Sequence, residues 1–298
     1  MLRNILILDC FFILTGSENK PKWRSLFNGK DPDEATDELI LYFELPNGIF
    51  KNIIQPNLIK IMNNLENKVA YITGGSKGIG YGIAQTLVEN GMRVAITSRT
   101  MNAAKQAAAS ISKDPSKVLA LESDVSSLAD ETKAVKAVID HFGQLDVLVA
   151  NAGVGHFVPI DSMSEEVWKE TIDTNLTGVF NSVKASVEAL KKSKGYIITI
   201  ASLAGTNFFE NGAAYNASKF GLVGFTQAIM LDLRKHGIKV TTIMPGSVAT
   251  YFNDHLPNDA DAWKIQPEDI GQMIADLLQM HPRTLPSKIE VRPSIPSK

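Results

Sequence analysis

From residue 62 onward, short apolar runs alternate with longer stretches of helical periodicity. Seven runs rich in β-branched residues indicate strands, at residues 69–73, 94–97, 118–121, 145–150, 196–201, 240–244 and 289–291. The helical stretches lie at residues 78–90, 101–112, 127–142, 165–192, 214–236 and 267–280. Near-continuous apolar strands separated by helices predict a parallel sheet covered on both faces. We therefore expect an α/β fold with a doubly wound, seven-stranded parallel sheet.

Several of the expected helices end on a glycine. Gly91, Gly143 and Gly237 each follow a helical stretch, where a left-handed residue commonly ends a helix. In doubly wound sheets, ligands bind at the carboxyl ends of the strands. We therefore expect the functional residues in the loops that follow the strands.

Residues 1–61 lack this alternation, so we expect an irregular or poorly ordered N-terminal extension followed by a single domain at residues 62–298. Met62 resembles a natural start, and residues 1–61 are then an appendage or a misassigned upstream translation. The most apolar stretch, residues 5–14, is too short for a membrane helix and contains Asp9. It could be the core of a signal peptide, but no clear cleavage site follows. We expect no membrane span and a cytoplasmic protein.

Composition excludes several classes of protein. Hydrophobic residues make up 44% of the chain and charged residues 21%, which argues against disorder. Lys and Arg number 30 against 32 Asp and Glu, so a nucleic-acid partner is not expected. The single cysteine, Cys10, rules out an internal disulfide or a multi-cysteine metal site, and we expect no metal.

A glycine-rich loop joins the first strand of this domain to its helix. The sequence Thr73-Gly-Gly-Ser-Lys-Gly-Ile-Gly80 suits close approach to a pyrophosphate at a helix N-terminus, although a tight turn needs glycines for its own sake. Its glycine spacing, Gly-x-x-x-Gly-x-Gly, differs from the common Gly-x-Gly-x-x-Gly fingerprint. The candidate nucleotide contacts in this loop are Gly74, Ser76, Lys77, Gly78, Ile79 and Gly80.

This spacing, together with Asn151-Ala-Gly153, Ser202 and Tyr215-Asn-Ala-Ser-Lys219, closely resembles the short-chain dehydrogenase/reductase family. The motifs follow the family's order and spacing across residues 66–292, and Lys77 stands where the family's extended branch needs a glycine. The resemblance implies a Rossmann-like fold and an NADP(H)-preferring member similar to 3-oxoacyl-acyl-carrier-protein reductase-like carbonyl reductases. The ending Ile289-Glu-Val-Arg-Pro-Ser294 departs from the one usual in those reductases, which leaves the substrate and a C-terminal tetramer contact open.

Four residues are candidates for catalysis. Tyr215 and Lys219 are four apart on one helix face, where a cation favours the phenolate and draws the tyrosine pKa toward neutrality. Alternatively, the two share a helix by chance, Ser202 is a helix or turn cap, and Asn175 is a tolerated polar residue. The resemblance implies that Tyr215 protonates the substrate oxygen, Ser202 hydrogen-bonds it, and Lys219 also holds the nicotinamide ribose. It implies that Asn175 positions a water.

The end of the second strand bears on the cofactor. Thr97-Ser-Arg-Thr100 has no carboxylate to accept bonds from an adenosine ribose. Ser98, Arg99 and Lys77 match positions of relatives that use the phosphorylated cofactor, and Arg99 can fork onto a phosphate. Either cation alone could be a solvated surface charge, but the pair without an acid favours NADP(H).

Further cofactor contacts follow the third, fourth and sixth strands. By resemblance, the adenine contacts are Asp124 and Val125, although Asp124 could equally cap a helix. Asn151, Ala152 and Gly153 let the cofactor lie close to the sheet, unless they form only a turn. The candidate contacts to the nicotinamide side are Pro245, Gly246, Val248 and Thr250, and a structural turn explains the first two equally well.

The sequence therefore predicts an oxidoreductase that transfers hydride between NADP(H) and a small carbonyl or secondary alcohol substrate. The alternative is a non-catalytic NADP(H)-binding regulatory protein, which would have no need of all four catalytic candidates. The long helices at 165–192 and 214–236 resemble the family's dimer face, so we expect a homodimer or homotetramer. The segment 247–266 is short for a lid and predicts an open pocket. Candidate lining residues are Phe157, Phe208, Phe209, Tyr251, Phe252 and His156.

Overall fold

A computed structural model describes residues 39–45, 48–54 and 65–295 of the chain. The chain divides into two compact units, Met1–Asn63 and Asn64–Lys298, which are described separately. The apolar stretch at residues 5–14, Cys10 and the expected start at Met62 lie outside the described residues.

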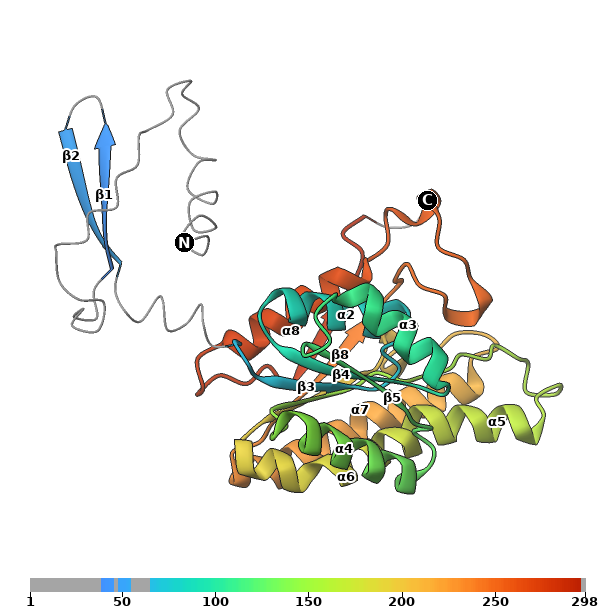
Figure 1. The fold of residues 1–298 in the computed structure, drawn as a ribbon. Coiled ribbons are helices and arrows are strands. Elements are labelled where there is room, and N and C mark those ends of the chain that lie inside the picture. The colour runs from blue at the N-terminus through green and yellow to red at the C-terminus, as the bar shows by residue number, and fades with distance from the viewer. Residues whose placement is uncertain (1–38, 46–47, 55–64, 296–298) are drawn as a thin grey trace. The chain divides into compact units, whose positions relative to one another are not determined.

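The described part of the first unit is a pair of antiparallel strands. β1 (Leu39–Leu45) runs against β2 (Gly48–Ile54), with Leu39 opposite Ile54 and Leu45 opposite Gly48 (Figure 1). Both are rich in β-branched and aromatic residues, which favour strands. The sequence predicts no strand here, because the alternation of strand and helix patterns is missing from this region.

The second unit is built on a seven-stranded sheet in the order β5-β4-β3-β6-β7-β8-β9, and every neighbouring pair is parallel. The strands are β3 (Val69–Ile72), β4 (Arg93–Ser98), β5 (Val118–Glu122), β6 (Val147–Ala150), β7 (Tyr196–Ile200), β8 (Lys239–Pro245) and β9 (Lys288–Val291). Each corresponds to one predicted apolar run. The expected doubly wound α/β fold is confirmed.

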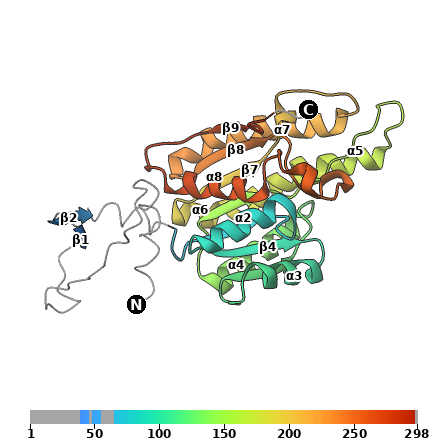
Figure 2. The ribbon, with the colours of Figure 1, turned by 90° about the horizontal axis from the view of Figure 1, so that it is seen from above.

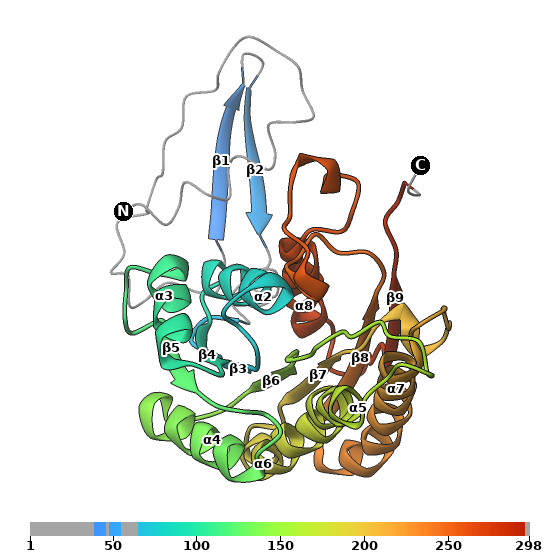
Figure 3. The ribbon, with the colours of Figure 1, turned by 90° about the vertical axis from the view of Figure 1, so that its right-hand side faces the viewer.

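Helices cover both faces of this sheet (Figure 3). One layer holds α2 (Gly78–Glu89), α3 (Met101–Ile111) and α8 (Pro267–Gln279), and the other holds α4 (Leu128–Phe142), α6 (Gly178–Ser193) and α7 (Ala213–Leu233). The predicted glycine ends are also present, since Gly91, Gly143 and Gly237 all have left-handed backbone conformations.

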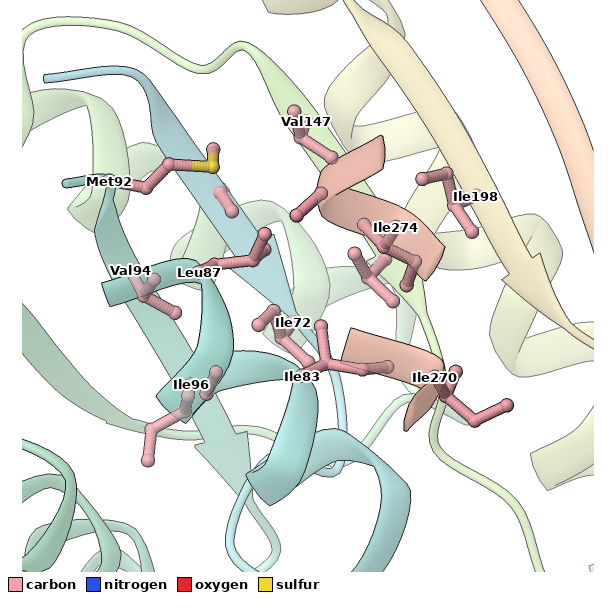
Figure 4. Close-up of a cluster of buried hydrophobic side chains, with 14 of the residues drawn as sticks. Ile72, Ile83, Leu87, Met92, Val94, Ile96, Val147, Ile198, Ile270 and Ile274 are labelled. Atoms are coloured by element: carbon pink, nitrogen blue, oxygen red, sulfur yellow. The ribbon is translucent and has the colours of Figure 1, made fainter. Parts of the chain in front are cut away.

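Alternation along the strands divides the core into two halves. On β3, Ala70 and Ile72 face the α2 and α8 side, where Ile83 and Ile274 join them (Figure 4). Val69 and Tyr71 face the opposite side and pack with residues of α4, α6 and α7. Successive strand side chains point to opposite faces, so strands buried on both sides need apolar residues throughout.

The topology places two loops beside each other. β3 pairs with β4 on one side and with β6 on the other, so the chain reverses its direction of travel across the sheet at this point. Figure 2 shows β8 and β9 on the opposite side of the sheet from β4. The loops after β3 and β6 therefore meet at the position where such sheets form their binding crevice.

One predicted helix is interrupted. The stretch expected at residues 165–192 consists of α5 (Glu165–Ile172), a π-helical turn (Asp173–Thr177) and α6. Hydrophobic periodicity cannot detect one extra residue in a turn, and π turns often mark functional sites. The helix expected at 214–236 is α7 followed by a 3₁₀ turn (Arg234–His236).

The contact between α2 and α8 generates a stability prediction. A Cβ atom on Gly82 would lie 2.6 Å from the backbone carbon of Pro267, whereas one on Gly224 in α7 would meet nothing within 4 Å. We expect Gly82→Ala to lower the free energy of unfolding by about 1–3 kcal/mol, because the helices must separate. Gly224→Ala should be neutral or stabilise by about 0.5–1 kcal/mol. Urea denaturation of both variants checks this, and equal midpoints would contradict it.

Candidate active site

The loop after β3 is folded tightly against its neighbours. Gly75 donates its N–H to the Thr97 carbonyl at 2.9 Å. Gly74 and Gly78 have left-handed backbones, with φ of +64° and +58°, and a Cβ on Gly80 would lie 2.5 Å from the Gly74 carbonyl oxygen. Helix α2 begins at Gly78 without a side-chain cap. Its first N–H groups are therefore available to a ligand.

Asn151 fastens this loop to the end of β6. Its side-chain amide donates to the carbonyls of Thr73 and Gly74, at 2.9 and 3.1 Å. In return, the Thr73 hydroxyl accepts the N–H groups of Asn151 and Ala152, at 3.0 and 3.1 Å. The structure thus brings the predicted residues of both loops together. Thr73 was not singled out from the sequence, although a buried hydroxyl at a strand end just before glycines is a usable signal.

Tyr215 and Ser202 meet beside the carboxyl end of β7. Tyr215 lies in the first turn of α7, and the Ser202 hydroxyl lies near enough to its phenol to lower the pKa of that phenol. The Ser202 oxygen also accepts the Ala204 N–H at 3.1 Å and so caps the 3₁₀ turn Leu203–Gly205. Ser202 therefore is the turn cap considered from the sequence, and it also contacts the tyrosine.

Lys219 lies one helical turn further along α7 and is 4% exposed. Its ammonium donates to the Ile200 carbonyl at 3.1 Å and lies 5.7 Å from the centre of the Tyr215 ring. A Cβ on Gly153 would lie 3.7 Å from this ammonium, so the end of β6 reaches the same place. Burial lowers the pKa of Lys219 to about 8.

The Tyr215 pKa differs from the expectation. Burial raises it to about 12, and the hydrogen bond from Ser202 only partly opposes the rise. The predicted lowering by Lys219 does not occur, because Tyr215 is 8% exposed and loss of solvent disfavours the phenolate. The phenol therefore keeps its proton at neutral pH.

Asn175 is fully buried in the π-helical turn. Its amide oxygen accepts the Val154 N–H at 2.8 Å, and its amide nitrogen donates to the Val154 carbonyl at 2.9 Å and to the Ser218 hydroxyl at 3.1 Å. Ser218 in turn donates to the Tyr215 carbonyl at 2.7 Å. Asn175 thus connects the loop after β6 to the helix of Tyr215, through a serine that the sequence analysis missed.

The two predicted phosphate-binding cations are accessible. The Arg99 side chain is 74% exposed, and its guanidinium lies 3.7 Å from the Glu170 carboxylate, which also contacts His156 at 3.0 Å. Lys77 is exposed and forms no ion pair with any other residue in the described part of the chain. Glu170 was missed because it lies 71 positions from Arg99 in the sequence.

The remaining adenine-side candidates lie at the carboxyl ends of β4 and β5. Ser98 is the last residue of β4. Asp124 accepts bonds from the N–H and hydroxyl of Ser126, at 2.9 and 2.8 Å, while Ser127 is the cap of α4. Val125 is buried, and its carbonyl accepts the Asn181 side chain at 2.9 Å. The Asp124 carboxylate therefore shapes the loop rather than capping the helix.

The segment after β8 reaches the glycine loop. Pro245 ends β8, and Gly246 donates to the Val291 carbonyl at 2.8 Å. Val248 forms an isolated parallel bridge with Ile265. Thr250 is buried, and a Cβ on Gly78 would lie 3.5 Å from its side chain. In the glycine loop itself, Ser76 and Ile79 are half-buried.

Three of the predicted pocket residues gather around the catalytic candidates. Phe157, Phe209 and Phe252 pack their rings around Tyr215, whereas Phe208 and Tyr251 are exposed outside this group. The expected open pocket is therefore partly covered, because the short segment after β8 carries Phe252 onto the tyrosine.

A family model described as short chain dehydrogenase matches residues 68–261. The chain belongs to this family of oxidoreductases. An uncharacterized oxidoreductase of Staphylococcus saprophyticus is 34% identical to it over 238 residues, 78% of this chain and all of that protein. A 3-oxoacyl-[acyl-carrier-protein] reductase of Vibrio cholerae is 38% identical over 197 residues, 66% of this chain and 80% of that protein.

Two solved structures are also similar to this chain. An alcohol dehydrogenase of Thermococcus sibiricus complexed with 5-hydroxy-NADP has a TM-score of 0.73 and 28% identity, over 78% of this chain and all of that one. A 3-ketoacyl-(acyl-carrier-protein) reductase of Brucella melitensis complexed with NADH has a TM-score of 0.71 and 27% identity, over 77% and 98%.

Another relative is much longer. Glycine betaine reductase ATRR of Emericella nidulans is 34% identical over 213 residues, 71% of this chain but 17% of that protein. Within the described residues, no helix combines the length and apolar character needed to span a membrane. The same residues contain no group of three or more His, Cys, Asp or Glu side chains placed to hold a metal ion.

The buried Lys219 predicts how stability depends on pH. Between the folded-state pKa of about 8 and the ordinary 10.5, the unfolded chain binds a proton that the folded chain does not. The free energy of unfolding therefore rises with pH in this window. From about pH 7.5 to about pH 10, the protein should gain about 2 kcal/mol relative to Lys219→Met. Urea denaturation at each pH measures this difference, and parallel curves would contradict the shift.

Proposed function

We propose that this protein is an NADP(H)-dependent oxidoreductase that interconverts a carbonyl compound and an alcohol, with Tyr215 as the general acid and base. The observation that carries the proposal is the Tyr215 phenol, which lies beside the Ser202 hydroxyl and the buried ammonium of Lys219. A non-catalytic binding protein would have no use for a protonated phenol held against a hydroxyl and a cation.

Four residues of the chain have separate roles in the proposed proton transfer. The Tyr215 phenol, protonated at neutral pH, donates its proton to the oxygen of the substrate as negative charge develops there. The Ser202 hydroxyl is placed to donate a hydrogen bond to the same oxygen and stabilise it. Lys219 supplies a positive charge beside the phenol below about pH 8. Asn175 holds the loop after β6 in position and fixes the backbone behind Tyr215.

The site also fits a nicotinamide dinucleotide. Gly74 and Gly80 allow the tight turn after β3, since a Cβ on them would lie 2.9 Å from the Ala152 backbone and 2.5 Å from the Gly74 carbonyl oxygen. This turn leads to the uncapped start of α2, where N–H groups can bind a pyrophosphate. The backbone of Gly153 lies beside the Lys219 ammonium, at the end of the neighbouring strand β6. When bound, such a cofactor supplies or accepts the hydride. Pro245, Val248 and Thr250 would contact its nicotinamide end, and Asp124 and Val125 its adenine end.

The choice of NADP(H) rests on two cations. Lys77 lies in the glycine loop, the largely exposed Arg99 directly follows β4, and residues 97–101 contain no acid to repel a 2′-phosphate. A bound 2′-phosphate would compete with the Glu170 carboxylate for the Arg99 guanidinium. The relative from Thermococcus sibiricus was crystallised with an NADP derivative and the one from Brucella melitensis with NADH, so similarity alone does not choose between the cofactors.

We also propose that residues 62–298 carry the activity and that the protein forms a homodimer or homotetramer. Large apolar side chains on the outer helices support this, since Trp168 on α5, Phe180 on α6, and Phe220 and Leu231 on α7 are each more than a third exposed. Aromatic side chains of this size are enriched at protein–protein interfaces.

Removing the phenol hydroxyl tests the proposed chemistry. Tyr215→Phe should lower kcat by about 10²–10⁴-fold, because the proton donor is lost while the ring stays. NADPH consumption over a broad panel of carbonyl compounds measures this. Tyr196→Phe is the matched control, since it removes a buried hydroxyl bonded to Thr241 at the opposite end of β7. Near-normal turnover by Tyr215→Phe would exclude the proposed role.

The cofactor preference has its own test. Arg99→Ser combined with Lys77→Ala should weaken NADPH binding by about tenfold or more and leave NADH binding nearly unchanged, because only the 2′-phosphate loses its charge partners. Protein fluorescence during titration with each cofactor measures both affinities. Arg283→Ser, which removes an exposed arginine elsewhere, should change neither. Equal losses for both cofactors would show that the cations do not read the 2′-phosphate.

A further inference from the structure

Three phenylalanine rings from three separate loops surround the Tyr215 ring. Phe157 follows β6, Phe209 follows β7 and Phe252 follows β8. Their ring centres lie 5.6, 6.4 and 5.6 Å from that of Tyr215. β6, β7 and β8 are neighbours in the sheet, so their loops converge at one edge. The fold therefore places an aromatic wall around the proposed proton donor.

The positions of two of these rings depend on glycines. A Cβ on Gly155 would lie 2.3 Å from the Phe252 ring, and a Cβ on Gly212 would lie 2.8 Å from the Phe209 ring. The loop that carries Phe209 is also held by Asn216, whose side chain donates to the carbonyl of Asn207 at 2.8 Å. The rings of Phe252 and Phe209 therefore pack directly against the backbone at Gly155 and Gly212, which fixes their positions.

The wall is incompletely buried. Phe157, Phe209 and Phe252 keep 39%, 44% and 37% of their surface exposed, beside a tyrosine that is 8% exposed. Exposed apolar surface next to a polar reacting group is typical of a ligand site, where an apolar portion of the ligand displaces water. The part of a substrate next to its carbonyl would therefore meet ring surface.

The charged residues around the aromatic wall bear on the charge that a substrate can carry. The three loops, residues 154–163, 203–212 and 247–258, contain no lysine or arginine. A thioester of coenzyme A or of a carrier protein brings phosphate groups that call for such cations. A cationic substrate would face the Lys219 ammonium, which lies 5.7 Å from the Tyr215 ring centre. The loops also contain the acids Asp161, Glu210 and Asp254. The Lys219 ammonium is therefore the group that disfavours a cationic substrate, and the lack of lysine and arginine disfavours one that carries phosphates.

We propose that the substrate is a free, neutral carbonyl compound with an aryl or compact branched alkyl group near the carbonyl, and that Phe252 is a specificity-determining residue. This inference rests on the proposed function. Phe252 is the ring on the segment after β8, and it precedes Asn253, whose backbone is left-handed (φ 55°). Its ring contacts both Phe157 and Tyr215, so it closes the wall on that side.

Matched substrates test the proposed class with the full-length protein and NADPH. 3,3-Dimethylbutanal and betaine aldehyde have the same shape, but only the second carries a positive charge. Ethyl benzoylacetate and acetoacetyl-coenzyme A are both 3-oxoacyl compounds, but only the second carries phosphates. We expect kcat/KM to be at least about tenfold higher for the neutral member of each pair. Preference for either charged member would overturn the inference and leave the proposed function intact.

A pair of variants tests Phe252 itself. Phe252→Ala should lower kcat/KM for 3,3-dimethylbutanal by about tenfold or more, change that for propanal much less, and leave NADPH affinity unchanged. Phe252→Leu should recover part of the loss. Leu256→Ala, which truncates a 72% exposed side chain on the same segment, is the control. Equal effects of Phe252→Ala on both aldehydes would overturn the role of Phe252. Absence of turnover with every carbonyl would overturn this inference and the proposed function together.

Discussion

The parallel pairing of β3 with β6 is the constraint on which the site depends. It brings the glycine loop beside the end of β6, and Asn151 and Thr73 then join the two loops by four hydrogen bonds. The same strand end leads to Gly153, which lies against the Lys219 ammonium. One pairing therefore connects the region suited to phosphates with the region suited to proton transfer. A different strand order would leave both sets of residues intact and separate them.

Burial raises the pKa of Tyr215 and lowers the pKa of Lys219, for the same physical reason. Each group is pushed toward its neutral form, the phenol by a rise to about 12 and the ammonium by a fall to about 8. The two side chains share a dry environment made by the phenylalanine wall and by α7 packed on the sheet. This environment strengthens any electrostatic interaction with a charge that develops on a bound substrate.

Hydrophobic periodicity predicted the strands, the helices and the parallel sheet, because buried strands and amphipathic helices leave strong local patterns. Resemblance then pointed to residues that the fold brings together in two groups, Asn151 with the glycine loop and Tyr215 with Lys219. Three kinds of feature could not be predicted from the sequence. The contacts of Glu170 with Arg99 and His156 join residues distant in the chain, so no local pattern reveals them. The tyrosine pKa depends on how fully the ring is buried, which helical spacing does not report. The π-helical turn adds one residue to a helix without changing the kinds of residue in it, so hydrophobic periodicity does not reveal it.

That turn, Asp173–Thr177, also has a consequence for how the chain tolerates change in length. Each residue of a regular helix advances the side chains by roughly 100° around its axis. Deleting one residue between α5 and α6 would let a regular helix form, but it would rotate the buried face of α6 relative to that of α5. Asn181, whose side chain holds the Val125 carbonyl, and the core residue Val183 would then leave the sheet. The extra residue sets the angle between the buried faces of the two helices, so this short stretch should accept substitutions at its half-buried positions more readily than a deletion.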